Sequence, residues 1–176
     1  RDGKLVRIDK PDDANASAFR DLLLLQLRSD WTIGGRTHAA GSLLAADFEG
    51  YLAGKREFEV LFEPTERSTL SDFTPTLNHV ILNVLDNVRN RLYVLTRVDG
   101  KWQREPLPGM PEFGTVSADA VDNEENDDYF LVEIEEIPET TQLTVEIEAL
   151  MRSVQGTFEM YVKLNGEMVY LWRAVD

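Results

Sequence analysis

Short apolar runs separated by turn residues constrain the fold of this chain more than any other feature. Several runs alternate polar and apolar residues, and others are apolar almost throughout. Because no sustained helical period accompanies them, these runs predict β-strands and an all-β fold. The predicted strands cover residues 4–8, 19–27, 42–46, 57–62, 79–85, 91–98, 101–107, 114–121, 129–134, 142–147, 158–164 and 167–172.

Two dipeptides predict tight hairpins between neighbouring strands. Asp99-Gly100 and Asn165-Gly166 are dipeptides that tolerate positive φ, as two-residue hairpin turns require. One short helix is predicted over 47–53, where Phe48, Tyr51 and Leu52 share a face and Gly54 ends the segment. A second helix is possible at 148–154.

A weak internal repeat predicts how the strands are grouped. The segments 19–30, 77–88 and 127–137 each run from polar to densely apolar to acidic residues. Four-stranded blades of a β-propeller have this kind of spacing, and each blade is covered on both faces by its neighbours. The chain has room for about three blades, an incomplete propeller arc, since closed propellers have about 4–8. Residues 1–176 are accordingly predicted to be a single all-β domain or a propeller fragment.

Composition excludes several classes of function. The chain has 43% hydrophobic residues, enough for a core, and a net charge of −14, which disfavours nucleic acid and anionic membranes as partners. It has no cysteine, which excludes disulfides and cysteine nucleophiles. Its two histidines argue against a histidine-rich metal site, and we expect no cofactor. The absence of cysteine favours a cytoplasmic location, although Arg1 is not a start residue and a removed leader remains open.

Five segments resemble one family of enzymes in the same order along the chain. The likeness spans residues 2–132 and is to the propeller of the prolyl oligopeptidase family of serine peptidases. The segment 144–176 lies outside it and is predicted to be a divergent C-terminal β-hairpin segment. The matching segments are DGKLVRIDKPDDA (2–14), LRSDWTIGG and THAAGSLLA (27–45), FEGYLAGKREFEVLFEPTERSTL (48–70), NHVILNVLDNVRNRLYVLT (78–96) and REPLPGMPEFGTVSADAVD (104–122).

The resemblance implies that this chain has a non-catalytic role. In this family a propeller covers an α/β-hydrolase domain, which carries the Ser, Asp and His and receives short peptides. The hydrolase nucleophile lies in G-x-S-x-G, a motif that this sequence lacks, so no catalytic residue is predicted. We therefore expect a non-catalytic propeller portion that gates peptide access and docks on the hydrolase. The alternative is a stand-alone acidic all-β binding or interaction module.

The stretch 28–45 contains the side-chain types of a charge-assisted nucleophile in Asp30, His38 and Ser42. A triad is assembled by the fold and not by spacing along the chain, so the favoured interpretation is a strand connector. Trp31, Arg36 and His38 remain candidates for contact with a peptide or a neighbouring domain. The alternative interpretation, which we favour, is that the glycines serve the turns and Trp31 packs on the blade.

Three further sets of polar residues have competing interpretations. Asn87 and Arg89, beside other charges after a central strand, form either a surface ion-pair network or a contact for a peptide terminus. His79 is expected to be a hydrogen-bonded structural residue. The acidic turn 122–128 lacks the spacing of a calcium loop, and 133–136 is expected to be a solvated strand face, so no metal site is predicted.

Overall fold

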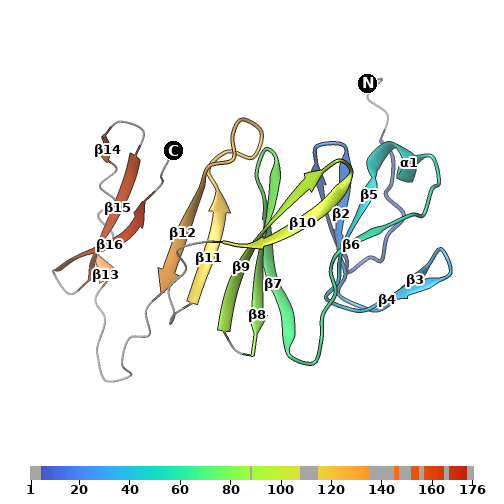
Figure 1. Cartoon of the computed structure of the whole chain (residues 1–176), viewed down its shortest axis with the longest axis horizontal. Coiled ribbons are helices and arrows are strands. Elements are labelled where there is room, and N and C mark those ends of the chain that lie inside the picture. The colour runs from blue at the N-terminus through green and yellow to red at the C-terminus, as the bar shows by residue number, and fades with distance from the viewer. Residues whose placement is uncertain are drawn as a thin grey trace. The chain divides into compact units, whose positions relative to one another are not determined.

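The computed structural model describes residues 5–87, 89–107, 115–134, 145–146, 152–154, 157–164 and 167–173. The chain divides into two compact units, residues 1–70 and 71–176, and each is described by itself. Strands dominate both units (Figure 1). Within the described residues, no helix is long and apolar enough to cross a membrane.

The first unit is built on a four-stranded antiparallel sheet with the order β1-β2-β5-β6. A short hairpin, β3 and β4, is inserted between the second and third strands of this sheet, and helix α1 follows the third (Figure 1). The elements are β1 (Asn15–Phe19), β2 (Leu22–Gln26), β3 (Trp31–Ile33), β4 (Arg36–His38), β5 (Leu43–Asp47), α1 (Phe48–Leu52) and β6 (Glu59–Phe62).

The apolar run at 19–27 was expected to be one strand, and the structure shows instead that it contains a chain reversal. Phe19 ends β1 and pairs with Leu22 at the start of β2. Arg20 takes up the turn at φ 55° without help from a glycine, which is why the turn leaves no sequence signal. Burial on both faces explains why β2 is apolar except for Gln26, and Leu24 and Leu25 are fully buried. The strand predicted over 4–8 is wrong for its described residues, 5–8, which form no regular element.

Helix α1 lies within the predicted segment 47–53, whose end residues Asp47 and Ala53 are its caps. The side chain of Asp47 accepts a hydrogen bond from the Gly50 backbone N–H at 2.7 Å, which caps the first turn. Gly54 follows the helix at φ 96°, a conformation that glycine adopts at little cost.

The second unit begins with a four-stranded antiparallel sheet in which consecutive strands are neighbours. The Asp99-Gly100 turn between two of them has φ 50° and 76°, as the dipeptide predicts. Leu82 and Val80 are fully buried in this sheet. Its strands are β7 (Ser68–Pro75), β8 (His79–Asp86), β9 (Arg89–Val98) and β10 (Lys101–Pro106).

Two further groups of strands follow. β11 (Thr115–Ala120) and β12 (Tyr129–Ile134) form an antiparallel pair, close to the predicted strands. Ile81, Leu92 and Leu107 pack against Val116 and Ala118, so the preceding sheet and β11 share a core cluster.

The remaining strands lie after residue 144, and β15 and β16 form the predicted final hairpin. The Asn165-Gly166 turn itself lies outside the described residues. The possible helix at 148–154 is wrong where it is described, because Arg152–Val154 is strand β14 paired with β15. These strands are β13 (Val145–Glu146), β14 (Arg152–Val154), β15 (Thr157–Leu164) and β16 (Glu167–Arg173).

Candidate functional site

The predicted contact residues Trp31, Arg36 and His38 lie on the β3–β4 hairpin rather than on an irregular loop. Trp31 pairs with His38 and Ile33 with Arg36 across the two strands. The turn is Gly34-Gly35, at φ 60° and 79°. The glycines therefore serve the turn, as the structural interpretation of this stretch requires.

Trp31 and His38 contribute to an aromatic cluster around Phe58, which we call the Phe58 cluster. The Trp31, His38 and Tyr51 rings meet the Phe58 ring edge-on, with centroids 5.5, 5.7 and 5.8 Å away, respectively. His38 is only 4% exposed. Arg36 is exposed, so the structure does not bring all three candidates to one surface.

The environment of His38 favours its neutral form. Burial lowers the pKa of His38, and the positive charge of Arg36 lowers it further, while Glu63 acts in the opposite direction. A buried, neutral imidazole edge-on to a phenyl ring is suited to packing.

Asp30 and Ser42 do not complete a nucleophilic triad with His38. Asp30 Oδ1 accepts the backbone N–H of Ala40 at 2.8 Å, which closes the loop after the hairpin. Ser42 is 1% exposed, and its backbone N–H and C=O bond to Ala39 and Leu27. No hydrogen bond joins the three side chains among the contacts of the described residues.

Asn87 and Arg89 lie at the turn between β8 and β9. Asn87 adopts φ 47° and donates from Nδ2 to Asp86 Oδ1 at 2.9 Å. The same carboxylate pairs with Arg91, whose Nε is 3.2 Å from Asp86 Oδ2. Asn87 and Arg91 thus both contact Asp86 at the surface, and contact of Asn87 or Arg89 with a peptide stays a prediction.

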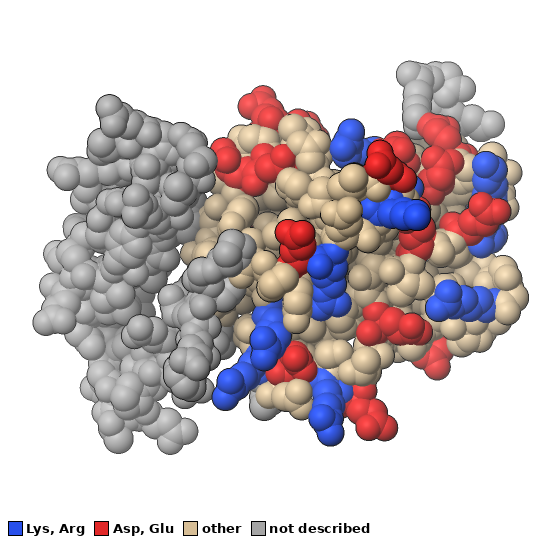
Figure 2. All heavy atoms as spheres, viewed as in Figure 1, with Lys and Arg blue, Asp and Glu red and all other residues tan. Residues whose placement is uncertain are grey.

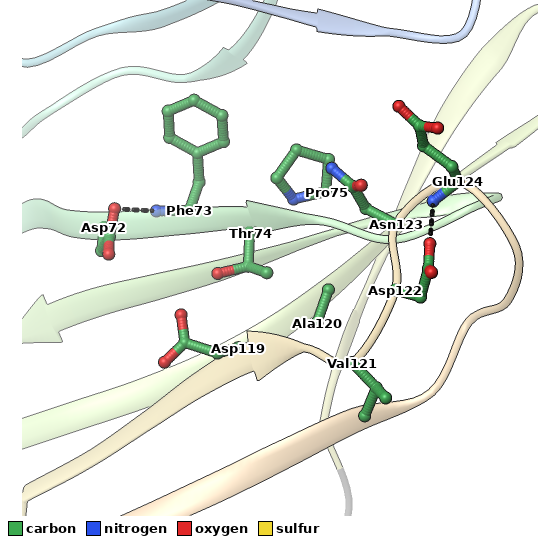
Figure 3. A pocket seen from close by; sticks show the side chains of 10 residues that line it. All are labelled: Asp72, Phe73, Thr74, Pro75, Asp119, Ala120, Val121, Asp122, Asn123 and Glu124. Carbon is green, nitrogen blue, oxygen red and sulfur yellow. Dashed lines mark hydrogen bonds between the residues drawn. The ribbon is translucent and has the colours of Figure 1, made fainter.

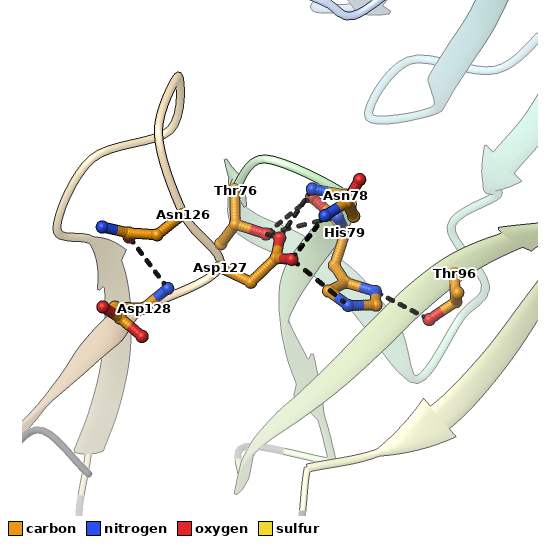
Figure 4. Close-up of polar contacts among 7 residues, drawn as sticks. All are labelled: Thr76, Asn78, His79, Thr96, Asn126, Asp127 and Asp128. Carbon is orange, nitrogen blue, oxygen red and sulfur yellow. Dashed lines mark hydrogen bonds and ion pairs between the residues drawn. The ribbon is translucent and has the colours of Figure 1, made fainter. Parts of the chain in front are cut away.

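The sequence did not indicate the contacts that Asp127, in the acidic turn 122–128, makes in the structure (Figure 4). Its carboxylate accepts hydrogen bonds from Thr76 Oγ1 at 2.7 Å, from the Asn78 backbone N–H at 2.6 Å and from Asn78 Nδ2 at 2.7 Å. The donors belong to the β7–β8 turn, and Asp127 belongs to the loop between β11 and β12. We call this set of contacts the Asp127 clasp.

His79 extends the clasp into the neighbouring strand. Its Nε2 is 3.9 Å from Asp127 Oδ2, and its Nδ1 is 2.8 Å from Thr96 Oγ1 on β9. The expectation that His79 is a hydrogen-bonded structural residue agrees with these contacts. Burial alone would raise the pKa of Asp127, but the hydrogen bonds from Asn78 and Thr76 and the charge of His79 outweigh it, so its pKa is lowered.

A cavity of about 590 Å³ lies beside the same loop, between β7 and β11 (Figure 3). Thr74 Oγ1 donates to the Ala118 carbonyl at 2.8 Å and joins the two strands there. The carboxylates that line this cavity suit a cationic group better than an anion. Among the described residues, no group of three or more His, Cys, Asp or Glu is placed to hold a metal ion. The lining residues are Asp72, Phe73, Thr74, Pro75, Asp119, Ala120, Val121, Asp122, Asn123 and Glu124.

Acidic and basic side chains are interspersed on the described surface that Figure 2 shows. Both signs occur over both units in this view, despite the net charge of −14. This distribution is that of a solvated surface rather than of a single charged face.

Comparisons with known proteins agree with the resemblance seen in the sequence. The chain is 27% identical over 151 residues, 84% of its length, to an uncharacterized peptidase of Rickettsia prowazekii. It is 32% identical over 127 residues, 70% of its length, to an uncharacterized peptidase of Sinorhizobium fredii. The structure of a post-proline cleaving enzyme from Rickettsia typhi matches 93% of the chain with a TM-score of 0.62 and 20% identity. The chain is related to the prolyl oligopeptidase family of peptidases.

The chain spans about a fifth of the two peptidases, 21% and 17% of their lengths, and 28% of the post-proline cleaving enzyme. The predicted fold class, β-propeller-like blades with one short helix, is confirmed by the strand arrangement and by this structural likeness to a prolyl-oligopeptidase-type enzyme. No model of a known protein family matches the chain.

A second similarity involves a different kind of protease. Over 41 residues, 23% of the chain, the sequence is 66% identical to Lon protease 3 of Sorangium cellulosum. Because the match covers 5% of that protein, the activity of a whole Lon protease cannot be assigned to this chain.

Proposed function

We propose that this chain is a non-catalytic propeller portion of a prolyl-oligopeptidase-like serine peptidase. The observation that carries the proposal is the combination of peptidase relatives over most of the chain with sheets built as four-stranded antiparallel blades. The parent reaction of such a peptidase is acyl transfer by a serine nucleophile, for which this chain supplies none of the residues.

The part played by the chain is to restrict which peptides reach the active site of an α/β-hydrolase domain and to dock on that domain. Propeller blades support this role because they form a rigid wall from backbone hydrogen bonds and packed apolar side chains. The exposed Arg36, Asn87 and Arg89 remain candidates for contact with a peptide or with the hydrolase.

Hydrolysis by the purified chain tests the non-catalytic assignment. We expect no cleavage of a chromogenic peptide with proline before the scissile bond, with or without a serine-directed inhibitor. Inhibitor-sensitive turnover that follows the chain through purification, and that Ser42→Ala abolishes, would contradict it. Ser117→Ala provides a matched control, since Ser117 also lies outside any G-x-S-x-G motif.

The second candidate is a stand-alone acidic all-β binding or interaction module. The net charge of −14 and the cavity lined by Asp72, Asp119, Asp122 and Glu124 favour a cationic partner for such a module. The two candidates differ in whether the same gene also encodes a hydrolase.

A further inference from the structure

Strand β10 forms one edge of the sheet that runs from β7 to β10 (Figure 1). Among the described strands it pairs with β9 alone, so its outer side is a sheet edge. Its residues are exposed, apart from the half-buried Trp102. An extended segment of suitable chemistry can therefore pair with this edge and add a strand to the sheet.

One hydrogen bond identifies the backbone groups of β10 that point away from β9. The Leu107 N–H donates to the Leu92 carbonyl of β9 at 2.9 Å, so Leu107 directs its backbone groups toward β9. Because this direction alternates along an antiparallel strand, Trp102 and Arg104 direct their N–H and C=O groups outward. Pro106 has the same outward direction, which suits a residue that has no N–H to donate.

The residues of this edge have matching chemistry in both directions along the strand. Lys101 and Glu105, at the two ends, carry opposite charges. Trp102 and Arg104, next to them, are an aromatic ring and a cation. Gln103 lies at the centre, and its amide both donates and accepts hydrogen bonds. The segment 101–105 is therefore complementary to its own reverse, which is the arrangement that a two-fold axis produces.

From this complementarity we propose that two copies of the chain associate by antiparallel pairing of their β10 strands, about a two-fold axis at Gln103. In this dimer Lys101 lies opposite the partner's Glu105, and Trp102 lies opposite the partner's Arg104. The inference goes beyond the proposed function and does not depend on it.

The backbone directions select this register. Trp102 and the partner's Arg104 both direct their backbone groups outward, so they form hydrogen-bonded pairs, with about four hydrogen bonds in the dimer. Lys101 and the partner's Glu105 form a non-hydrogen-bonded pair, in which side chains lie closest. A shift by one residue sets outward groups against inward groups and loses these hydrogen bonds. A shift by two places either Arg104 opposite Arg104 or Lys101 opposite Gln103.

One face of β9 and β10 already pairs cations with aromatic rings within a single copy. The Arg104 guanidinium lies 3.7 Å from the centroid of the Tyr93 ring. Arg97, directly across from Trp102 in the sheet, lies 6.0 Å from the centroid of the indole. In the dimer the partner's Arg104 lies on the other side of Trp102, so the alternation of cations and rings continues across the interface.

The other edge strands of the two four-stranded sheets lack this complementarity. β1 has no charged residue, and β6 and β7 each have one carboxylate, Glu59 and Asp72, and no Lys or Arg. Self-pairing of β6 or β7 therefore brings no cation to these carboxylates. Of these four edges, β10 is the one whose own charges favour a second copy.

The proposed interface is small, and the net charge of −14 on each chain opposes association. Pairing over 101–105 buries less surface than the roughly 1,600 Å² of a standard interface. At about 0.15 M salt, charges more than roughly 8 Å apart are largely screened, so the local pairs decide the outcome. We expect a weak dimer whose fraction rises with protein concentration.

Sedimentation equilibrium of the whole chain tests the proposal, over about 10 µM to 1 mM protein at about 0.15 M salt. The wild type should change from monomer to dimer within this range. Lys101→Glu and Glu105→Lys each place like charges opposite each other twice, so each should weaken dimerisation by about tenfold or more. A wild type that stays monomeric at every concentration, or a dimer that neither variant weakens, would overturn the proposal.

Mixing the two single variants distinguishes β10 pairing from a general effect of charge. In the mixture, each Lys101→Glu copy presents two carboxylates to the two ammonium groups of a Glu105→Lys copy, so association should return. Lys55→Glu and Glu66→Lys change exposed charges outside β10 and should dimerise like the wild type. If a single variant fails to fold, the double variant Lys101→Glu/Glu105→Lys restores opposite charges and should dimerise. A mixture or a double variant that stays monomeric would contradict the proposed register.

Discussion

The Asp127 carboxylate accepts the backbone N–H of Asn78 at 2.6 Å, although 49 positions separate the two residues. Asn78 also donates to the same carboxylate from its side chain, at 2.7 Å. The contact joins the β7–β8 turn to the loop between β11 and β12. The contact therefore links the sheet of β7 to β10 with the β11–β12 pair.

Replacing the clasp carboxylate tests its contribution to stability. Asp127→Asn removes the charge and leaves three donors facing an amide, so we expect the free energy of unfolding to fall by about 1–3 kcal/mol. Chemical denaturation at neutral pH measures the change. Glu125→Gln removes the same charge from an exposed position of the same loop and should change stability little; an equal loss in both variants would contradict the role of the clasp.

Acid titration tests the same residue in another way. Burial alone would raise the pKa of Asp127, but hydrogen bonding lowers it. The ionised carboxylate therefore contributes to the free energy of unfolding at pH values above the ordinary aspartate pKa of about 3.9. That contribution is lost as the pH falls through the lower pKa of the folded state. Stability measured from pH 5 downward should fall less steeply in Asp127→Asn than in the wild type, and parallel curves would contradict this.

The Asp99-Gly100 turn offers a test of backbone conformation alone. Gly100 has φ 76° and open space around the position of a Cβ atom, so Gly100→Ala adds strain without a clash. We expect a loss of about 1 kcal/mol in the free energy of unfolding. Lys101→Ala, at the adjacent exposed residue, is the control, and equal effects would show that the turn conformation is not the cause.

Core substitutions test the buried strands of each unit. Leu24 and Leu82 are 0% exposed, so truncation to alanine leaves cavities, and each variant should lose about 2–5 kcal/mol in the free energy of unfolding. Leu5 is 97% exposed, and Leu5→Ala should leave stability unchanged. Urea denaturation measures all three, and a mild effect at Leu24 or Leu82 would contradict their place in the core.

The sequence was sufficient to predict the strands whose apolar runs are bounded by clear turn signals. β8, β12 and α1 lie close to their predicted positions. β1 and β7 were missed, because one is short and rich in alanine and the other is polar and ends in proline. The reversal at Arg20 was missed because its positive φ is carried by a residue with no preference for it.

The candidate residues show a different limit. Trp31 and His38 are neighbours across a hairpin, so local sequence could suggest that they belong together. Asp127 comes from a part of the chain that is distant from Thr76 and His79, and no pattern in the sequence pairs it with them before the sheets are assembled. Contact of Arg36, Asn87 or Arg89 with a peptide stays a prediction.

The gene that encodes this chain provides the most direct test of the central claim, that the chain is the propeller portion of a serine peptidase. Sequencing the coding region beyond Asp176 should reveal a reading frame that continues for several hundred codons. It should contain a G-x-S-x-G motif at a predicted strand-to-helix turn, followed by an Asp and a His. A stop codon shortly after Asp176, or a continuation without that motif, would contradict the claim and favour the stand-alone module.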